Sequence, residues 1–212
     1  MYKVDKDFYK EHGWVLIESA IPEPSIVKIK EKGLKLRLWV EDKLGTPSQF
    51  GPLTHWKGIG CAGMYDEELY KFYQSRTMFT IASQLLGKEK LWLFNDQMVI
   101  KLPGDDFGFD IHRDNEFVQG NEEGKIHTVN LGVVLDDFTD LNGTIEVKGN
   151  NQEWSVTYPK KGDIIAINGN TPHCSSPNYS DNSRGLYACV YSEEQLNSYN
   201  FYSSIFSTIY DD

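Results

Sequence analysis

Apolar residues in the first third of the chain recur three or four positions apart, a spacing that gathers them on one face of a helix. The pattern is brief at residues 7–12 and then runs for some twenty residues up to Gly45. A further amphipathic run at 69–86 ends at Gly87, a residue suited to a left-handed helix cap. We therefore expect a helical N-terminal part covering about residues 1–90.

Residues 45–64 interrupt this pattern with many Gly, Pro, Thr and Ser residues, and they also contain His55 and Trp56. A loop of this length in a compact domain often serves as a lid or a binding element. We predict that this segment takes part in choosing the ligand.

Beyond Gly87 the pattern changes to short runs rich in β-branched and aromatic residues, which favour strands. Gly, Asn and Pro turns separate the runs. The predicted strands are 91–101, 127–135, 144–148, 154–158, 163–167 and 186–191. Many short strands with helices outside them predict a mainly β fold, a jelly roll or cupin-like double-stranded β-helix. We place this core at about 91–192 of one domain spanning 1–212.

Composition and charge limit the classes of function. No stretch approaches the eighteen or so apolar residues of a membrane helix, and the first residues do not resemble a signal peptide, so we expect a cytoplasmic protein without a membrane partner. The formal net charge of -10 argues against a nucleic-acid partner. The three cysteines lack C-x-x-C spacing, which indicates neither a disulfide framework nor a zinc knuckle. Oligomeric state does not follow from these residues.

Two short motifs in residues 104–114 suggest a protein kinase, but their arrangement excludes it. D-F-G at 106–108 precedes H-R-D at 112–114, whereas a kinase has them in the opposite order. No glycine-rich phosphate loop lies upstream. His112 and Asp114 therefore need another role.

His112 and Asp114 are two residues apart, and on a strand such residues point to the same side. A third imidazole would complete a facial triad of two histidines and one carboxylate, which binds Fe(2+) and leaves three adjacent positions for a co-substrate and O2. His173 is the best candidate among the five histidines, because it follows the turn after the predicted strand at 163–167. The H-x-D spacing alone is weak evidence, and a surface or capping role for His112 is the alternative.

The stretch K-G-D-I-I-A-I-N-G-N-T-P-H-C-S-S-P-N-Y-S-D-N-S-R, residues 161–184, resembles the C-terminal signature of the phytanoyl-CoA dioxygenase family of iron(II)- and 2-oxoglutarate-dependent oxygenases. Four further segments resemble the family in the correct order: F-Y-K-E-H-G-W-V-L-I at 8–17, Q-M-V-I-K-L-P-G at 97–104, H-R-D at 112–114 and V-V-L-D-D-F-T-D-L-N-G at 133–143. The resemblance extends over most of the chain apart from about 45–90. It implies an oxidoreductase on a double-stranded β-helix.

The resemblance also implies a role for each candidate residue. His112, Asp114 and His173 are the expected catalytic iron ligands. Arg184 is expected to hold the far carboxylate of 2-oxoglutarate, because a guanidinium can donate two parallel hydrogen bonds to a carboxylate. The further expected co-substrate contacts are Ser175, Gln97, Thr128 and Asn130. For the last three, ordinary strand packing is an equal alternative, and for Arg184 the alternative is a surface salt bridge.

The sequence departs from the family at Gly132, where the family often has Trp. A missing ring either opens space near the co-substrate or lets another part of the chain enter. The family's P-G-S-H after the Asn-Gly turn is also replaced, by V-K-G-N-N at 147–151.

We therefore expect a dioxygenase that hydroxylates an unactivated carbon of a small molecule and releases succinate and CO2. The acidic chain favours a neutral or cationic substrate, whose identity the sequence does not determine. One alternative is a metal-binding, non-oxidative protein, either a cupin-like isomerase or a sugar-binding module, which would have no need of Arg184 as a carboxylate partner. A demethylase of nucleic acid or protein side chains is disfavoured by the net charge and small size.

Overall fold

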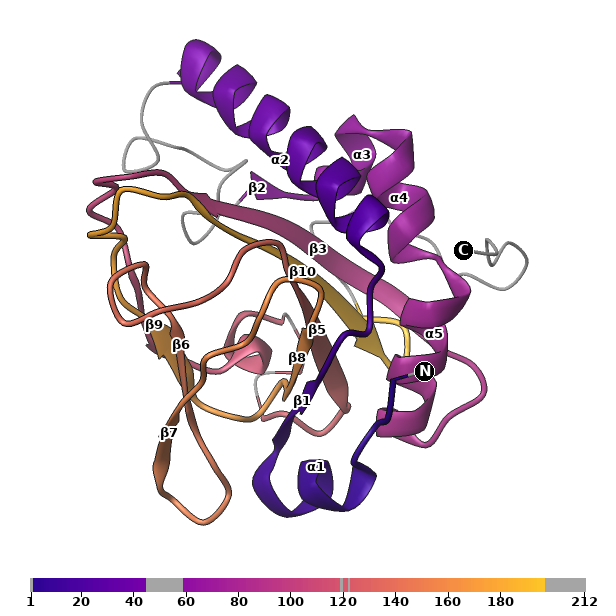
Figure 1. Cartoon of the computed structure of the whole chain (residues 1–212). Helices are drawn as coiled ribbons and strands as arrows, with labels where there is room; N and C mark the ends of the chain where they lie inside the picture. Colours follow the sequence, from indigo (N-terminus) through magenta and orange to yellow (C-terminus); the bar gives the residue numbers. More distant parts are fainter. Residues whose placement is uncertain (1, 45–58, 119, 122, 197–212) are drawn as a thin grey trace.

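The computed structural model describes residues 2–44, 59–118, 120–121 and 123–196. Within these residues the strands form two antiparallel sheets (Figure 1). The larger sheet has the order β1-β8-β5-β10-β3-β2 and the smaller sheet the order β4-β9-β6-β7. The predicted mainly β fold with flanking helices is confirmed.

The bounds of the strands are β1 (Trp14–Ile17), β2 (Ile59–Gly60), β3 (Trp92–Lys101), β4 (Phe109–His112), β5 (Thr128–Val134), β6 (Ile145–Lys148), β7 (Trp154–Val156), β8 (Ile164–Asn168), β9 (His173–Ser175) and β10 (Arg184–Ser192). The helices are α1 (Lys6–His12), α2 (Glu23–Leu44), α3 (Ala62–Tyr65), α4 (Glu67–Tyr73) and α5 (Arg76–Leu86), together with the short 3₁₀ helix η3 (Asp114–Phe117).

The helices cover one face of the larger sheet. Helix α2 contacts β3 and β10, and α5 contacts β5. The smaller sheet lies on the other side of the larger one, away from α2, α4 and α5 (Figure 1). None of the helices in the described part of the chain has the length and apolar character needed to cross a membrane.

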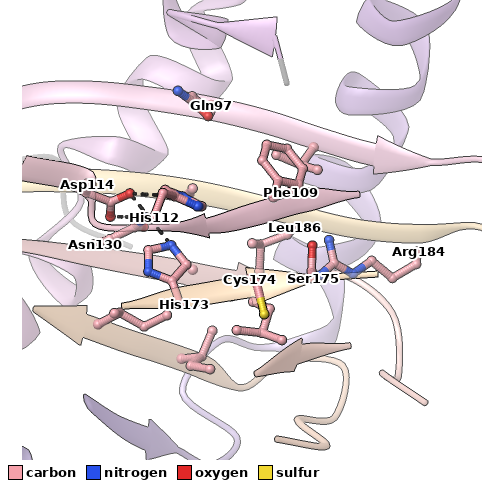
Figure 2. A pocket seen from close by; sticks show the side chains of 16 residues that line it. Gln97, Phe109, His112, Asp114, Asn130, His173, Cys174, Ser175, Arg184 and Leu186 are labelled. Carbon is pink, nitrogen blue, oxygen red and sulfur yellow. Dashed lines mark hydrogen bonds and ion pairs between the residues drawn. The ribbon is translucent and has the colours of Figure 1, made fainter. Parts of the chain in front are cut away.

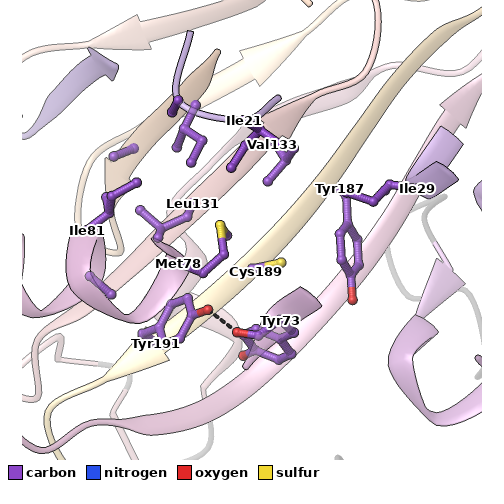
Figure 3. Close-up of a cluster of buried hydrophobic side chains, with 14 of the residues drawn as sticks. Ile21, Ile29, Tyr73, Met78, Ile81, Leu131, Val133, Tyr187, Cys189 and Tyr191 are labelled. Atoms are coloured by element: carbon purple, nitrogen blue, oxygen red, sulfur yellow. Dashed lines mark hydrogen bonds between the residues drawn. The ribbon is translucent and has the colours of Figure 1, made fainter. Parts of the chain in front are cut away.

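Strand alternation divides the interior into two apolar regions. On β5, Val129, Leu131 and Val133 belong to the cluster packed between the sheet and the helices (Figure 3). The intervening residues Asn130 and Gly132 face the space between the two sheets and line a cavity there. β10 alternates in the same way, because Tyr187, Cys189 and Tyr191 join the helix-side cluster while Arg184, Leu186 and Ala188 line the cavity. The period of two along a strand thus presents every second residue to the site.

The structure differs from the expected elements in three places. The predicted run at 69–86 is two helices, because Ser75 is extended (φ -61°, ψ 154°) and its side chain caps α5 by accepting from the Met78 amide at 3.4 Å. Strand β2, paired to β3, was not predicted, whereas β1, paired to β8, lies in the segment 8–17 that resembles the family's opening helix and strand. Strands β4 and β9 were not among the predicted runs, and were expected only through the alternation of His112 with Asp114 and of His173 with Ser175. The predicted cap at Gly87 is confirmed, with φ 68°.

Candidate metal centre and co-substrate pocket

His112 and His173 lie side by side across the β4 and β9 pair, at one end of the cavity between the sheets. Their ring centroids are 4.3 Å apart. Asp114 Oδ1 lies 3.8 Å from His112 Nε2 and 3.7 Å from His173 Nε2 (Figure 2). All three side chains offer ligand atoms within 4.8 Å of one another, a separation that suits one shared metal ion.

The structural basis that the sequence suggested for this convergence was wrong in one respect. β4 ends at His112, and Asp114 is the first residue of η3 rather than the next inward residue of a strand. The carboxylate reaches the imidazoles because the chain turns into η3, so the H-x-D spacing is satisfied by a strand end followed by a helical turn.

Backbone carbonyls orient both imidazoles. His112 Nδ1 lies 2.7 Å from the carbonyl oxygen of Asp110, and His173 Nδ1 lies 3.1 Å from that of Thr171. A carbonyl can only accept, so each Nδ1 carries a proton and each Nε2 is the ring nitrogen that faces Asp114. This is the arrangement that binding a metal ion through Nε2 requires.

Asn130 orients the carboxylate in the same way. Its Nδ2 donates to Asp114 Oδ2 at 3.0 Å, which leaves Oδ1 as the oxygen that faces the imidazoles (Figure 2). The Oδ1 atom of Asn130 itself is buried with no hydrogen-bond partner. A ligand in the cavity that carries an N–H or O–H group therefore finds an acceptor beside the metal centre.

Burial keeps His173 in its neutral form. Loss of solvent around the ring lowers its pKa, and the charge of Asp114 opposes this shift only in part. A neutral imidazole binds a metal ion without first losing a proton.

Arg184 occupies the other end of the same cavity, beside Ser175 (Figure 2). Only 1% of Arg184 is exposed, and its Nε and Nη2 atoms have no hydrogen-bond partner. Its Cζ lies 4.0 Å from the centroid of the Phe138 ring. Burial lowers the pKa of Arg184 to about 9, against a raising effect of Asp136, so the guanidinium is charged at neutral pH. A surface salt bridge, the alternative interpretation of this arginine, does not fit a guanidinium that is buried and has two N–H groups without hydrogen-bond partners.

Sequence reasoning missed Phe138, which contacts Arg184, and Lys101, which contacts Ser175. Lys101 is fully buried, and its backbone lies opposite that of Arg184 in the antiparallel register of β3 and β10. Its Nζ donates to Ser175 Oγ at 2.9 Å and to the carbonyl oxygen of Ser176. The alternation from Gln97 could have indicated Lys101, because residues two and four positions along the same strand share its face.

The other predicted contacts divide into two groups. Ser175, Gln97 and Asn130 line the cavity. Thr128 is fully buried, and its hydroxyl donates to Asn115 Oδ1 at 2.9 Å, so it supports the site from outside the cavity lining. Whether these residues contact a co-substrate stays a prediction.

Gly132 does not leave a hole in the cavity wall. A Cβ atom at this position would lie 3.0 Å from Ile165 Cγ2 and 3.1 Å from Leu186 Cδ1. Gly132 nevertheless lines the cavity, so which of the two outcomes expected for the missing Trp ring applies stays a prediction.

The remaining histidines are separate from this centre. His127 is exposed, and its Nδ1 lies 3.5 Å from Glu193 Oε1. His12 lies beside Glu11. His55 and Trp56, with most of the predicted 45–64 loop, fall outside the described residues.

The donor set fits iron(II) with 2-oxoglutarate. Two imidazoles and one carboxylate on one side of an ion form the triad typical of non-heme iron(II) oxygenases. A diacid that chelates the metal with one end would bring its other carboxylate toward the far end of the cavity, where Arg184 has two N–H groups without partners.

Comparisons with known proteins identify the family and the fold of this chain. The family model for phytanoyl-CoA dioxygenase (PhyH) matches residues 9–186. Among solved structures, the chain resembles the non-heme monooxygenase ThoJ (TM-score 0.76, 14% identity, 98% of this chain and 86% of that chain). It also resembles the non-heme alpha ketoglutarate dependent carbocyclase SnoK from nogalamycin biosynthesis (TM-score 0.73, 17% identity, 90% and 83%).

A third similar structure is EctD from S. alaskensis with 2-oxoglutarate and 5-hydroxyectoine (TM-score 0.69, 13% identity, 88% of this chain and 74% of that chain). At these identities the solved structures establish a shared fold, and the double-stranded β-helix expected from the sequence is confirmed. A comparison with curated protein sequences finds no match.

Proposed function

The chain belongs to the phytanoyl-CoA dioxygenase family of iron(II)- and 2-oxoglutarate-dependent oxygenases, and we propose that it hydroxylates an unactivated carbon of a small molecule. In the proposed reaction one oxygen atom of O2 enters the substrate. The other enters succinate, formed as 2-oxoglutarate loses CO2.

The observation that supports the proposal best is that one cavity carries candidate metal ligands at one end and a buried cation at the other. The triad of His112, Asp114 and His173 lies at one end, and the buried guanidinium of Arg184, with two N–H groups that have no hydrogen-bond partner, lies at the other. A metal site alone would not require a buried cation, whose burial without an anion is unfavourable. A dicarboxylate explains both ends at once.

The proposed roles follow from the contacts of each side chain. His112 and His173 bind iron through Nε2, and Asp114 binds it through Oδ1 while Asn130 holds the other oxygen. Arg184 holds the far carboxylate of 2-oxoglutarate, with Ser175 as a further hydrogen-bond donor. Lys101 already donates to Ser175 Oγ, so the hydroxyl hydrogen of Ser175 is left to point elsewhere.

The walls between the two ends are apolar. Val99, Ile165 and Leu186 line the cavity between the strands that carry the polar groups. They exclude water from the region between the metal and the guanidinium, which strengthens the electrostatic interactions there. When bound, iron(II) and 2-oxoglutarate supply the oxidising chemistry that the side chains of this protein lack.

Hydroxylation is proposed over halogenation because Asp114 supplies a carboxylate ligand. That carboxylate occupies the coordination position that a halide ion would need. The similar structures include a carbocyclase and an epimerase as well as a monooxygenase, so the product itself has to be identified.

The first test is anaerobic binding. Purified protein with iron(II) and 2-oxoglutarate is expected to develop the weak visible charge-transfer band of a chelated complex, and the band should be absent when either component is omitted. A protein that binds the metal but gives no band would support a non-oxidative metal-binding protein instead.

The second test seeks the substrate. Amino acids, polyamines and other small metabolites are screened for stimulated release of succinate, with neutral and cationic compounds expected to be favoured by the acidic chain. A product heavier by one oxygen atom, labelled by ¹⁸O2, would establish hydroxylation. Stimulated succinate release with a product of unchanged oxygen content would contradict it.

A further inference from the structure

Asn115 follows the candidate ligand Asp114 directly and is 1% exposed. Its backbone amide donates to the carbonyl oxygen of Gly169 at 2.9 Å. Its side chain donates from Nδ2 to Asn170 Oδ1 at 2.8 Å and accepts at Oδ1 from the Thr128 hydroxyl at 2.9 Å. A side chain with this many partners is held in one orientation.

These partners belong to the segments that carry or orient the other groups of the metal centre. Gly169 and Asn170 form the turn between β8 and β9, which leads into His173. The next residue, Thr171, provides the carbonyl oxygen beside His173 Nδ1. Asn115 therefore connects the segment that carries Asp114 to the segment that carries His173.

Strand β5 completes the connection. Thr128, which donates to Asn115, lies two residues before the residue that donates to Asp114 Oδ2, Asn130. Two neighbouring residues of η3, Asp114 and Asn115, are thus each held by one side chain of β5. The position of η3 relative to the sheet depends on both bonds.

The carboxamide of Asn115 meets both hydrogen-bonding requirements at this position. Asn170 donates from its own Nδ2 to the carbonyl oxygen of Gly124 at 2.9 Å, which directs its Oδ1 toward Asn115. The side chain at 115 must therefore donate to Asn170 and accept from Thr128. A carboxylate cannot donate, and an aliphatic side chain can do neither.

Gly169 shows how closely these segments approach. A Cβ atom there would lie 1.9 Å from Thr128 Oγ1 and 2.7 Å from Asn115 Oδ1. Any side chain at 169 would displace the hydroxyl and the carboxamide that bond to each other. The absence of a side chain at this position allows the connection to form.

We propose that Asn115 is a positioning residue that fixes the separation of the Asp114 carboxylate from the His173 imidazole and thereby sets the metal affinity of the site. It acts through the two ligands without binding the ion. The inference rests on the proposed metal site and adds to it a residue that the reaction itself does not use. Residues that orient metal ligands typically contribute 10- to 100-fold to affinity.

The test is a calorimetric titration of the metal-free protein with cobalt(II), a probe that does not depend on turnover. Asn115→Ala is expected to weaken cobalt(II) binding by about 10- to 100-fold. Thr128→Val removes one hydroxyl donor at nearly constant volume, and it is expected to weaken binding by about fivefold. Gly169→Ala is expected to weaken binding as well, because the added methyl group separates the same partners.

Asn121→Ala is the matched control. Asn121 is also a buried asparagine, 2% exposed, whose side chain makes two hydrogen bonds, but both are to the backbone of Ile126 in the loop before β5. Its loss is expected to lower the melting temperature of the metal-free protein while cobalt(II) affinity stays within about twofold of the wild type. A purely structural role of Asn115 predicts equal effects of the two alanine substitutions.

The outcomes separate this inference from the metal site on which it rests. If the wild type binds cobalt(II) and folded Thr128→Val and Asn115→Ala bind it equally well, the positioning role is wrong and the metal site stands. Equal losses in Asn121→Ala and Asn115→Ala would also overturn the role. If Asn115→Ala fails to fold, the cobalt(II) affinity of Thr128→Val becomes the measurement that tests the positioning role. If the wild type binds no cobalt(II), both the site and the positioning role are rejected.

Discussion

The guanidinium of Arg184 lies over the ring of Phe138, with its Cζ atom 4.0 Å from the ring centroid. The aromatic face provides partial compensation for the charge, but Nε and Nη2 remain without hydrogen-bond partners. A buried cation in this state is unfavourable until an anion arrives. Replacing Arg184 by an apolar residue should therefore weaken ligand binding but stabilise the protein without ligand.

Arg184→Met is expected to stabilise the metal-free, ligand-free protein by about 1–4 kcal/mol, because it replaces a buried charge by an apolar side chain of similar length. The same change should weaken 2-oxoglutarate binding by at least about tenfold, through loss of a charge-assisted hydrogen bond. Urea denaturation and calorimetry measure the two effects. Lys35→Met, at an exposed cation of α2 paired with Glu31, is the control and should change neither the stability nor the affinity for 2-oxoglutarate by much. Destabilisation by Arg184→Met would contradict the assignment of an unpaired charge.

The affinity for 2-oxoglutarate should fall at alkaline pH. Burial lowers the pKa of Arg184 to about 9, and only the protonated guanidinium attracts a carboxylate. Binding is therefore strongest below this pKa and weakens as pH rises through it. The apparent Kd should therefore be higher at pH 9.5 than at pH 7.5.

Calorimetry with 2-oxoglutarate on nickel(II)-loaded protein measures this change, and a parallel nickel(II) titration separates it from loss of the metal. The carboxyl groups of the ligand are ionised throughout this range, so they add no pH dependence of their own. A constant Kd between pH 7.5 and 9.5 would show that the pKa of Arg184 stays above this range.

Gly132→Trp is expected to destabilise the protein by about 1–3 kcal/mol rather than to recreate the family's frequent pocket. Ile165 and Leu186 already occupy the space beside Gly132, within 3.1 Å of where a Cβ would lie. Gly132→Ala, which adds only that one atom, should cost less. Chemical denaturation compares the two, and an unchanged stability of Gly132→Trp with tighter 2-oxoglutarate binding would refute this account.

Gly13→Ala should be more harmful than the same change at Gly87, although both glycines end helices in the left-handed conformation. At Gly13 (φ 79°) the new Cβ would lie 2.4 Å from Thr171 Oγ1, whereas at Gly87 nothing lies within 4 Å. Gly87→Ala should cost about 1 kcal/mol for backbone conformation alone. The loss of stability in Gly13→Ala should be larger by at least about 1 kcal/mol, because the hydrogen bond from Thr171 to the Gly13 carbonyl oxygen must also shift.

The melting temperatures of the two alanine variants, measured without metal, test this comparison. Equal losses would mean that Thr171 can move without cost. The result bears on the metal centre, because the carbonyl oxygen of Thr171 lies beside His173 Nδ1.

Much of the fold could be predicted because strand and helix periodicity are local properties of the sequence. The alternation in residues 128–134 and 184–192 reflects two buried faces, and the core strands were predicted close to their observed bounds. The break between α4 and α5 was missed, since Ser75 fits the amphipathic pattern and acts as a cap only once the chain turns there.

By itself, the sequence determined which chemical groups the centre contains: two imidazoles, one carboxylate and a distant guanidinium, in a recognisable order along the chain. Tertiary structure alone decided how they are held. Asp114 lies on η3, Phe138 lies under Arg184, and Asn115 bonds to Asn170 across 55 residues of sequence. Such contacts depend on the path of loops and the register of strands, and these are set by packing between distant segments rather than by any local pattern.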